Sequence, residues 1–242
     1  MAPFTSRSST LARVPSHVVG DVTTASAALL TRERSLPVDP VLAPVFVSGL
    51  VRGQTVVCAG SASVSSALAL LVAPTQQGSW AGVIGVPTFG VVAAADMGVV
   101  LERTVFVGGS LDAHGDPANV LGALVDGVDL VVTSSPFLAS LSPSLVRRFT
   151  TRLQSRGAVC IVVDDTRALS GDLRVTTRVR EWCGIGDGHG HVRARRVTVS
   201  VDGRRQARPT RRDVWLPGPS GRLEEIAETA SPDVPARLRI VP

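Results

Sequence analysis

Residues that suggest chemistry are concentrated between Gln54 and Val72, QTVVCAGSASVSSALALLV. A β-branched run from Thr55 to Ala59 is followed by small residues from Gly60 to Ser63 and by an Ala/Leu-rich segment from Ser65 to Val72. This order predicts a strand, a tight loop and a helix. Such a loop binds phosphate when it reads G-x-x-x-x-G-K-S/T, because backbone N–H groups and the Lys hold the phosphates and the hydroxyl holds Mg²⁺.

The residues that this chemistry needs are missing. Counted from Gly60, Ser65 replaces the second Gly, Ser66 replaces the Lys and Ala67 replaces the hydroxyl residue. We therefore expect a vestigial phosphate loop that holds no cofactor and supports no catalysis. An alternative is a regulator that holds nucleotide through backbone N–H groups alone, since Gly60 and a helix N-terminus are retained.

Arginine is the second chemical signal. The chain has no Lys, so every cationic side chain behind its net charge of +5 is Arg, and eleven Arg lie between residues 174 and 212 against three acidic residues. Arg binds phosphate and carboxylate in the same forked geometry, so the cluster predicts an acidic partner or DNA backbone contact, with a solvated surface as the alternative. The candidate contacts are Arg193, Arg195, Arg196, Arg204, Arg205, Arg208, Arg211 and Arg212, with Trp182 and Trp215 as interface anchors or core residues.

Three further sets of residues favour structural interpretations. Arg148, Arg152 and Arg156 are spaced to share one helix face, which we expect to be solvated. Cys58 and Cys160 lie in apolar runs, which predicts buried thiols in a reduced, cytoplasmic protein. No secretion signal is recognised in the sequence, which favours the same compartment. Cys183, His189 and His191 lack a fourth metal ligand, so we expect no metal site.

The elements that must position these residues alternate along the chain. Short apolar strands followed by helices predict right-handed β-α-β units and an α/β fold with a doubly wound, mainly parallel sheet. The expected strands are Thr55–Ala59, Ala81–Val86, Thr104–Val107, Val128–Thr133 and Ala158–Val163, and the expected helices are Val22–Arg32, Ser65–Val72, Val91–Met97, Pro117–Val125 and Pro143–Arg156.

The C-terminal part changes pattern. Arg196 to Val201 alternates in polarity and precedes Asp202-Gly203, which predicts an antiparallel strand and a two-residue hairpin turn. We expect Val197, Val199 and Val201 to face the core, and Arg196, Thr198 and Ser200 to face solvent. The predicted organisation is an N-terminal helical segment and Pro-spaced linker (1–45), a core (46–180), an Arg-rich antiparallel extension (181–221) and a Pro-rich tail (222–242).

The turn Gly49–Gly53, the Gly60 loop and the strand from Val128 to Ser135 together resemble the RecA core over about residues 36 to 180. The resemblance implies a RecA-like fold and assigns Ser134 to the position of the metal-binding carboxylate. It places Pro87 where the catalytic glutamate belongs, and Asp164 and Asp165 where a polar sensor pair meets the γ-phosphate. With these positions and the loop Lys changed together, the chain is not expected to be an ATPase.

A narrower resemblance is to the actinobacterial ImuA-prime family. The segments that carry it are Gly60-Ser61, Gly78–Pro87, Gly98–Arg103, Trp182–Gly186, Arg193–Arg196 and Trp215–Pro217. The resemblance implies a non-catalytic accessory protein of DNA-damage-induced translesion synthesis. Its partners would be an ImuB-like homologue of Y-family polymerases and, indirectly, an error-prone C-family polymerase. A SulA-like division inhibitor and a DNA-binding module are the alternatives.

Overall fold

The computed structural model describes residues 34–108, 116–164, 171–185, 190–204, 206, 208–226 and 237–239. The chain divides into two compact units, Met1–Arg34 and Ser35–Pro242. The predicted helix Val22–Arg32 lies outside the described residues. The second unit contains the sheet and every candidate site that follows.

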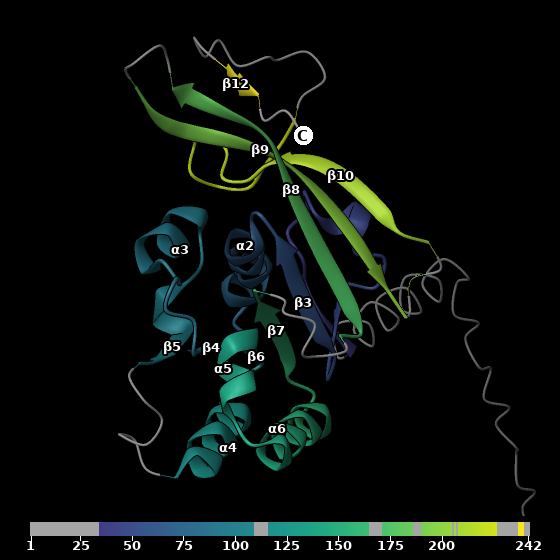
Figure 1. Ribbon diagram of the computed structural model, residues 1–242. Helices are drawn as coiled ribbons and strands as arrows, with labels where there is room; N and C mark the ends of the chain where they lie inside the picture. Colours follow the sequence, from purple (N-terminus) through teal and green to yellow (C-terminus); the bar gives the residue numbers. More distant parts are fainter. Residues whose placement is uncertain are drawn as a thin grey trace, which may run out of the picture. The chain divides into compact units, whose positions relative to one another are not determined.

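A central sheet organises the second unit (Figure 1). Its parallel strands are β3 (Thr55–Gly60), β4 (Ala81–Ile84), β5 (Thr104–Val107), β6 (Leu130–Ser134), β7 (Val159–Val163) and β8 (Leu173–Ile185). They lie in the order β5-β4-β6-β7-β3-β8, so β3 is flanked by β7 and β8. Beyond β8 the sheet continues antiparallel through β9 (Gly190–Gly203), β10 (Thr210–Trp215) and β11 (Glu224–Glu225), and β12 (Arg237–Arg239) pairs with β8. The predicted fold class, a doubly wound and mainly parallel sheet with an antiparallel C-terminal extension, is confirmed.

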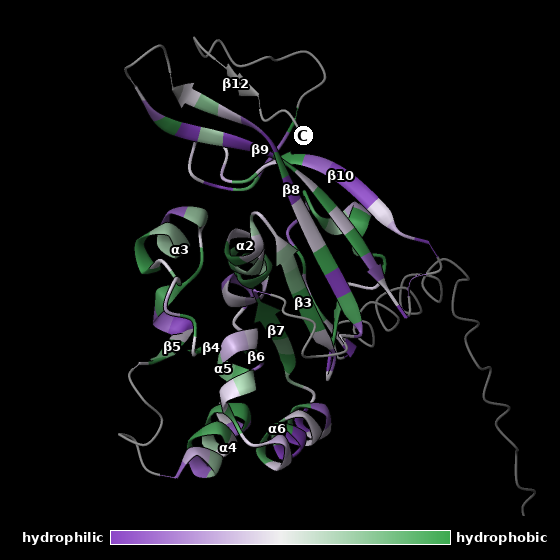
Figure 2. Ribbon diagram, viewed as in Figure 1, coloured by the Kyte–Doolittle hydropathy of each residue, from purple (hydrophilic) through white to green (hydrophobic). Residues whose placement is uncertain are grey.

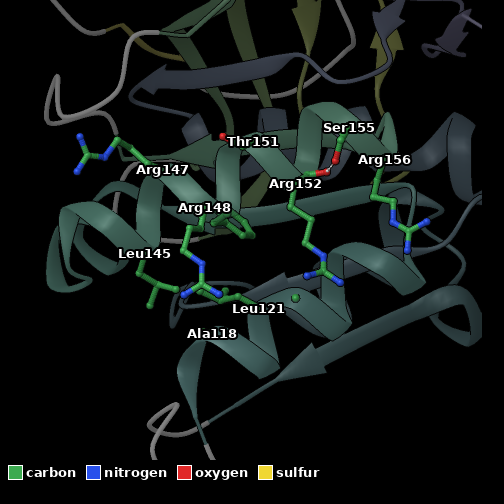
Figure 3. Close-up of a pocket in the computed structure, with 11 residues that line it drawn as sticks. Ala118, Leu121, Leu145, Arg147, Arg148, Thr151, Arg152, Ser155 and Arg156 are labelled. Carbon is green, nitrogen blue, oxygen red and sulfur yellow. Dashed lines mark hydrogen bonds between the residues drawn. The ribbon is translucent and has the colours of Figure 1, made fainter.

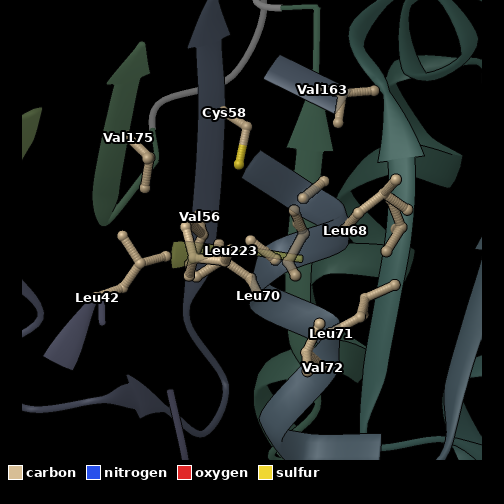
Figure 4. Close-up of a cluster of buried hydrophobic side chains, with 14 of the residues drawn as sticks. Leu42, Val56, Cys58, Leu68, Leu70, Leu71, Val72, Val163, Val175 and Leu223 are labelled. Carbon is tan, nitrogen blue, oxygen red and sulfur yellow. The ribbon is translucent and has the colours of Figure 1, made fainter. Parts of the chain in front are cut away.

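Helices cover both faces of β3, β4, β6 and β7. On one face lie α2 (Ser63–Gln76) and α3 (Val91–Met97), and on the other lie α4 (Pro117–Gly127), α5 (Ser135–Ser140) and α6 (Pro143–Arg156). Successive residues of one strand therefore enter different cores: Val56 and Cys58 pack beneath α2, whereas Val57 packs beneath α4 and α6. Figure 4 shows the α2 side of this arrangement, with leucines of α2 beside β3 and β7. Two covered faces explain why these strands are continuously apolar.

Short elements complete the unit. β1 (Ser35–Leu36) and β2 (Leu50–Val51) form a separate antiparallel pair, and the 3-10 turns η1 (Ala43–Val45) and η2 (Leu101–Arg103) lie in connections. No helix in the described part of the chain is long and apolar enough to cross a bilayer.

Two helices differ from the sequence prediction. α2 begins at Ser63 rather than Ser65 and continues through Pro74 to Gln76, because its apolar residues remain buried to Thr75. α5 was not predicted, although Ser134 followed by Ser135 and Pro136 is a helix-start signal. Its Ser134 Oγ accepts a hydrogen bond from the Phe137 N–H at 3.3 Å.

The antiparallel region corrects two details. The prediction of a two-residue hairpin turn at Asp202-Gly203 is wrong, because β9 runs through Gly203 and β10 starts only at Thr210. Gly203 instead allows close approach to the Asp172 carbonyl, which accepts the Arg204 N–H at 3.1 Å. The core-facing positions Val197, Val199 and Val201 are confirmed, whereas Thr198 is buried rather than solvent-facing.

Candidate functional site

Gly60, the first residue of the expected phosphate loop, is held by packing against β8. Its φ is +91°, and a Cβ at this position would overlap the carbonyl oxygen of Thr177. Only glycine combines this backbone conformation with so close an approach. The residue that most suggested phosphate binding is therefore required by the fold itself.

Backbone N–H groups after Gly60 are directed to the same strand. Ser61 donates to the Thr177 carbonyl at 3.1 Å, and Ala62 donates to Thr177 Oγ1 at 3.1 Å. Thr177 Oγ1 in turn donates to the Ala59 carbonyl at 2.9 Å. In a working phosphate loop, successive N–H groups face the anion. Here two of them are bonded to β8, which closes that part of the loop.

Arg195 of β9 reaches the first turn of α2. Its Nη2 donates to Ser65 Oγ at 2.7 Å, its Nε donates to the Leu216 carbonyl at 2.7 Å, and its guanidinium lies 5.2 Å from the centre of the Trp182 ring. Arg195 is 8% exposed, and no carboxylate of the described residues lies within ion-pair distance of it. Burial lowers the pKa of Arg195. The chain thus places its own cation against the helix end where a phosphate loop would receive an anion.

A carboxylate borders the loop on the β7 side. Ser63 Oγ donates to Asp164 Oδ1 at 3.0 Å, and Asp164 has a φ of +59°, which is uncommon for a residue other than glycine. A negative charge at the start of α2 opposes the binding of a phosphate group. Asp165, the second residue of the predicted sensor pair, lies outside the described residues.

The remaining vestigial positions have structural partners. Ser66 Oγ donates to the Ala62 carbonyl at 2.9 Å within its own helix, and Ala67 is fully buried in the core. Ser134 Oγ donates to the Gly85 carbonyl at 2.5 Å, in addition to capping α5. The positions that would supply the lysine, the metal-binding hydroxyl and the metal-binding carboxylate therefore serve the fold. Pro87, at the position of the catalytic glutamate, is exposed.

Arginines gather on the face of β8, β9 and β10 that is turned away from the α2 core. Alternation along the three strands places five of them there, and Figure 2 shows hydrophilic residues alternating with hydrophobic ones on these strands. We call this surface the basic face; its residues are Arg174, Arg178, Arg180, Arg196 and Arg211, with Glu181, Asp202 and Asp213 as acidic neighbours. Arg174, Arg178 and Arg180 were not among the candidate contacts, although strand alternation before Cys183 could have identified them.

A hydrogen-bond network crosses the basic face and explains why Thr198 is buried. Arg180 Nε donates to Thr198 Oγ1 at 2.8 Å, and Thr198 Oγ1 donates to Asp213 Oδ1 at 2.7 Å. Arg196 Nη2 pairs with Asp213 Oδ2 at 2.9 Å. Burial of Asp213 acts to raise its pKa, but the hydrogen bonds from Thr198 and Arg196 and the charge of Arg211 outweigh it, so the pKa is lowered. The carboxylate is charged and keeps the guanidinium of Arg196 in place.

The other predicted contact residues divide into surface and interior positions. Trp215 is buried with Cys183 and Ala194, and Trp182 is half-buried under Arg195. Arg212 pairs with Glu225. The exposed predicted contacts are Arg193, Arg204, Arg208 and Arg211, and Arg205 lies outside the described residues.

The cysteines are buried thiols. Burial raises the pKa of Cys58 and of Cys160 to about 12, and Cys183 is also buried. Of the histidines considered as metal ligands, His191 is exposed and His189 lies outside the described residues. Among the residues with described positions, no three His, Cys, Asp or Glu side chains form a group that could hold a metal ion.

Comparison with known proteins identifies relatives of the core. The model of a family described as the MT3502 N-terminal domain matches residues 44–168, just over half of the chain. Uncharacterized protein Rv3395c of Mycobacterium tuberculosis is 29% identical over 129 residues, which cover 53% of this chain. The match spans only 57% of that relative's length. A mycobacterial relative agrees with the actinobacterial origin of the resemblance seen in the sequence.

Proposed function

The chain belongs to the MT3502 N-terminal domain family, and we propose that it is a non-catalytic, RecA-like adaptor of DNA-damage-induced translesion synthesis. The observation that carries the proposal is the occupation of the vestigial phosphate loop by the chain's own groups. Thr177 accepts hydrogen bonds from two N–H groups of the loop, and Arg195 lies against the first turn of α2. A scaffold that is folded around a filled nucleotide site is suited to binding partners rather than to phosphoryl transfer.

The specific role rests on the resemblance to the ImuA-prime family. We propose an ImuB-like homologue of Y-family polymerases as the direct partner, and an error-prone C-family polymerase as an indirect one. The basic face supports this role, because its five arginines exceed its acidic residues and Arg forks bind carboxylates of an acidic partner surface. The adaptor would work in the cytoplasm, at the nucleoid when recruited.

A co-expression pull-down tests the partner. The expected result is that the Y-family-like protein captures the unaltered chain, and that Arg178→Glu with Arg211→Glu abolishes capture. Both side chains are exposed on the basic face. The matched control is Arg222→Glu, an exposed arginine near the end of α3. Absence of capture of the unaltered chain at every salt concentration would remove the proposal.

Nucleotide binding is tested separately. A ligand that binds only the folded state raises the melting temperature. Because we expect no nucleotide to bind, the melting temperature of the chain should stay unchanged with millimolar ATP and Mg²⁺. A clear rise that is lost in a Ser65→Arg variant would instead support the nucleotide-binding regulator.

DNA binding is a second candidate function, favoured by the same basic face. Contacts would be made to the phosphate backbone, because Trp215 is buried and the half-buried ring of Trp182 is stacked against Arg195, so neither offers a free stacking platform. Its signature is an affinity for duplex DNA that falls steeply as salt is raised. Binding that is weak and insensitive to salt would exclude this candidate.

A further inference from the structure

A groove runs between α4 and α6, on the face of the sheet opposite to α2 (Figure 3). Its volume is about 600 Å³, within the range of sites that hold small molecules or peptide side chains. The floor is apolar: Leu121 and Phe149 are buried, and Leu145 is half-buried beside them. Leu145 keeps apolar surface accessible above the two buried residues, and covering such surface with another apolar side chain is favourable.

The rim of the groove is basic. Arg147, Arg148, Arg152 and Arg156 line it from α6, and α6 contains no acidic residue. Figure 3 shows Arg148 and Arg152 extending from α6 toward α4. Arg148 is exposed and has no hydrogen-bond or ion-pair partner within the described part of the chain. The rim therefore carries more positive charge than its surroundings neutralise.

Asp126 of α4 demonstrates how this rim binds a carboxylate. Arg152 donates to both of its oxygens, through Nε at 2.9 Å and through Nη2, and Arg156 Nε donates to Oδ1 at 2.9 Å. These hydrogen bonds lower the pKa of Asp126 far below its usual range, the bond from Arg152 most strongly. One carboxylate thus occupies two of the four arginines, in the forked geometry that guanidinium groups favour.

The guanidinium of Arg152 extends over Gly122 of α4. A Cβ added at Gly122 would lie 3.4 Å from Arg152 Nη1, an ordinary van der Waals distance, so the guanidinium lies directly over this turn of the helix. Arg152 therefore lies across α4 and forms one wall of the groove.

We propose that this groove docks an acidic, amphipathic segment of a partner protein, with an aliphatic side chain against Leu145 and carboxylates on Arg148 and its neighbours. Charge complementarity selects the occupant, because the rim has an excess of arginine around an apolar floor. Arg148, Arg152 and Arg156 are about 6 Å apart along α6, and the groove from Leu145 to Arg156 is about 17 Å long. A partner helix of about 11 residues, with acidic side chains four residues apart, matches both lengths.

The inference does not depend on the translesion role, since it uses none of the residues of the basic face. A nucleic acid strand fits this groove less well, because phosphate gains nothing from the apolar floor made by Leu121 and Leu145. The test therefore compares a ligand that carries carboxylates and an aliphatic side chain with a ligand that carries phosphates.

A phage-displayed library of random 12-residue peptides provides the probe. Selection on the purified full chain is expected to enrich sequences with Asp or Glu four residues apart and an intervening Leu, Ile or Met. The leading peptide, labelled with fluorescein, is then titrated by fluorescence anisotropy. Enrichment of peptides without acidic residues, or no enrichment, would overturn the proposal.

Three variants locate the bound peptide. Arg148→Glu is expected to weaken binding at least tenfold by reversing a rim charge, and Ala118→Trp is expected to weaken it as much by filling the groove without changing charge. The control is Arg178→Glu, the same charge reversal on the basic face, which should leave affinity unchanged within twofold. Equal loss in the control, or displacement of the peptide by a DNA 12-mer, would overturn the proposal. Circular dichroism melting verifies that each variant is folded.

Discussion

An arginine side chain lies against the first turn of α2, and another lies in the groove between α4 and α6. The two arginines differ in exposure and in hydrogen-bond partners. At the first turn of α2, Arg195 is 8% exposed and donates to Ser65 and to a backbone carbonyl. In the groove between α4 and α6, Arg148 is exposed and has no partner among the described residues. The first arginine belongs to the folded structure, because its removal would leave polar atoms unpaired. The second is available for binding, because its guanidinium is exposed and no described residue forms a hydrogen bond or ion pair with it.

The sharpest test of a filled loop is Gly60→Ala. The added Cβ would overlap the Thr177 carbonyl at a positive φ, so we expect the free energy of unfolding to fall by about 3 kcal/mol or more. Gly78→Ala is the matched control, since Gly78 has a similar φ of +98° but no atom within 4 Å of the new Cβ. Its loss should be about 1 to 2 kcal/mol, from backbone conformation alone. Equal losses in urea titrations would show that the loop is not closed against β8.

Arg195→Ala should have the next largest effect. It removes two hydrogen bonds and leaves a cavity over the ring of Trp182, so a loss of about 2 to 4 kcal/mol is expected. Arg195→Met keeps most of the volume and should lose only about 1 kcal/mol, because burying an apolar chain of similar size offsets the lost bonds. An unchanged denaturation midpoint for Arg195→Ala would show that this guanidinium contributes no more to stability than the exposed arginines of the groove do.

Thr177→Val separates hydrogen bonding from packing in the same loop. The substitution keeps the shape of the side chain but removes the acceptor for the Ala62 N–H and the donor to the Ala59 carbonyl. A loss of about 1 to 2 kcal/mol is expected, because the buried Ala62 N–H and the partly buried Ala59 carbonyl each lose a partner. By comparison, Arg148→Glu in the groove should change stability by less than about 0.5 kcal/mol, as exposed substitutions usually do. Melting curves of the two variants, recorded side by side, measure the difference.

Sequence patterns predicted the sheet and the loss of the loop residues, but not what replaced them. Apolar runs located β3, β4, β6 and β7, because these strands are covered on both faces. The first half of β8 alternates between buried residues and exposed or half-buried ones, and β8 was not predicted. Arg195 was assigned to the surface by its charge, yet it lies two residues before Val197, on the same face of β9. Extending the alternation by one step would have turned its side chain toward α2.

The groove was less predictable. The spacing of Arg148, Arg152 and Arg156 showed a common face of α6, and the sequence indicated solvent there. The spacing could not predict which helix lies beside α6. α4 packs against α6 because of the order of β6 and β7 in the sheet, which is set by the tertiary fold. Burial of Leu121 and Phe149 beneath the arginines is a tertiary property.

A small effect on affinity is expected at Asp126, whose carboxylate already occupies part of the groove rim. Asp126→Asn keeps the side-chain shape but frees Arg152 and Arg156, which raises the positive charge of the rim by one. If the groove binds acidic segments through these arginines, affinity for the selected peptide should increase by roughly 2- to 5-fold, the size of an exposed ion pair. The gain should shrink at high salt, because exposed charges are screened. A decrease in affinity would mean that Asp126 holds Arg152 in its binding orientation, so that the rim is preorganised by the ion pair rather than opposed by it.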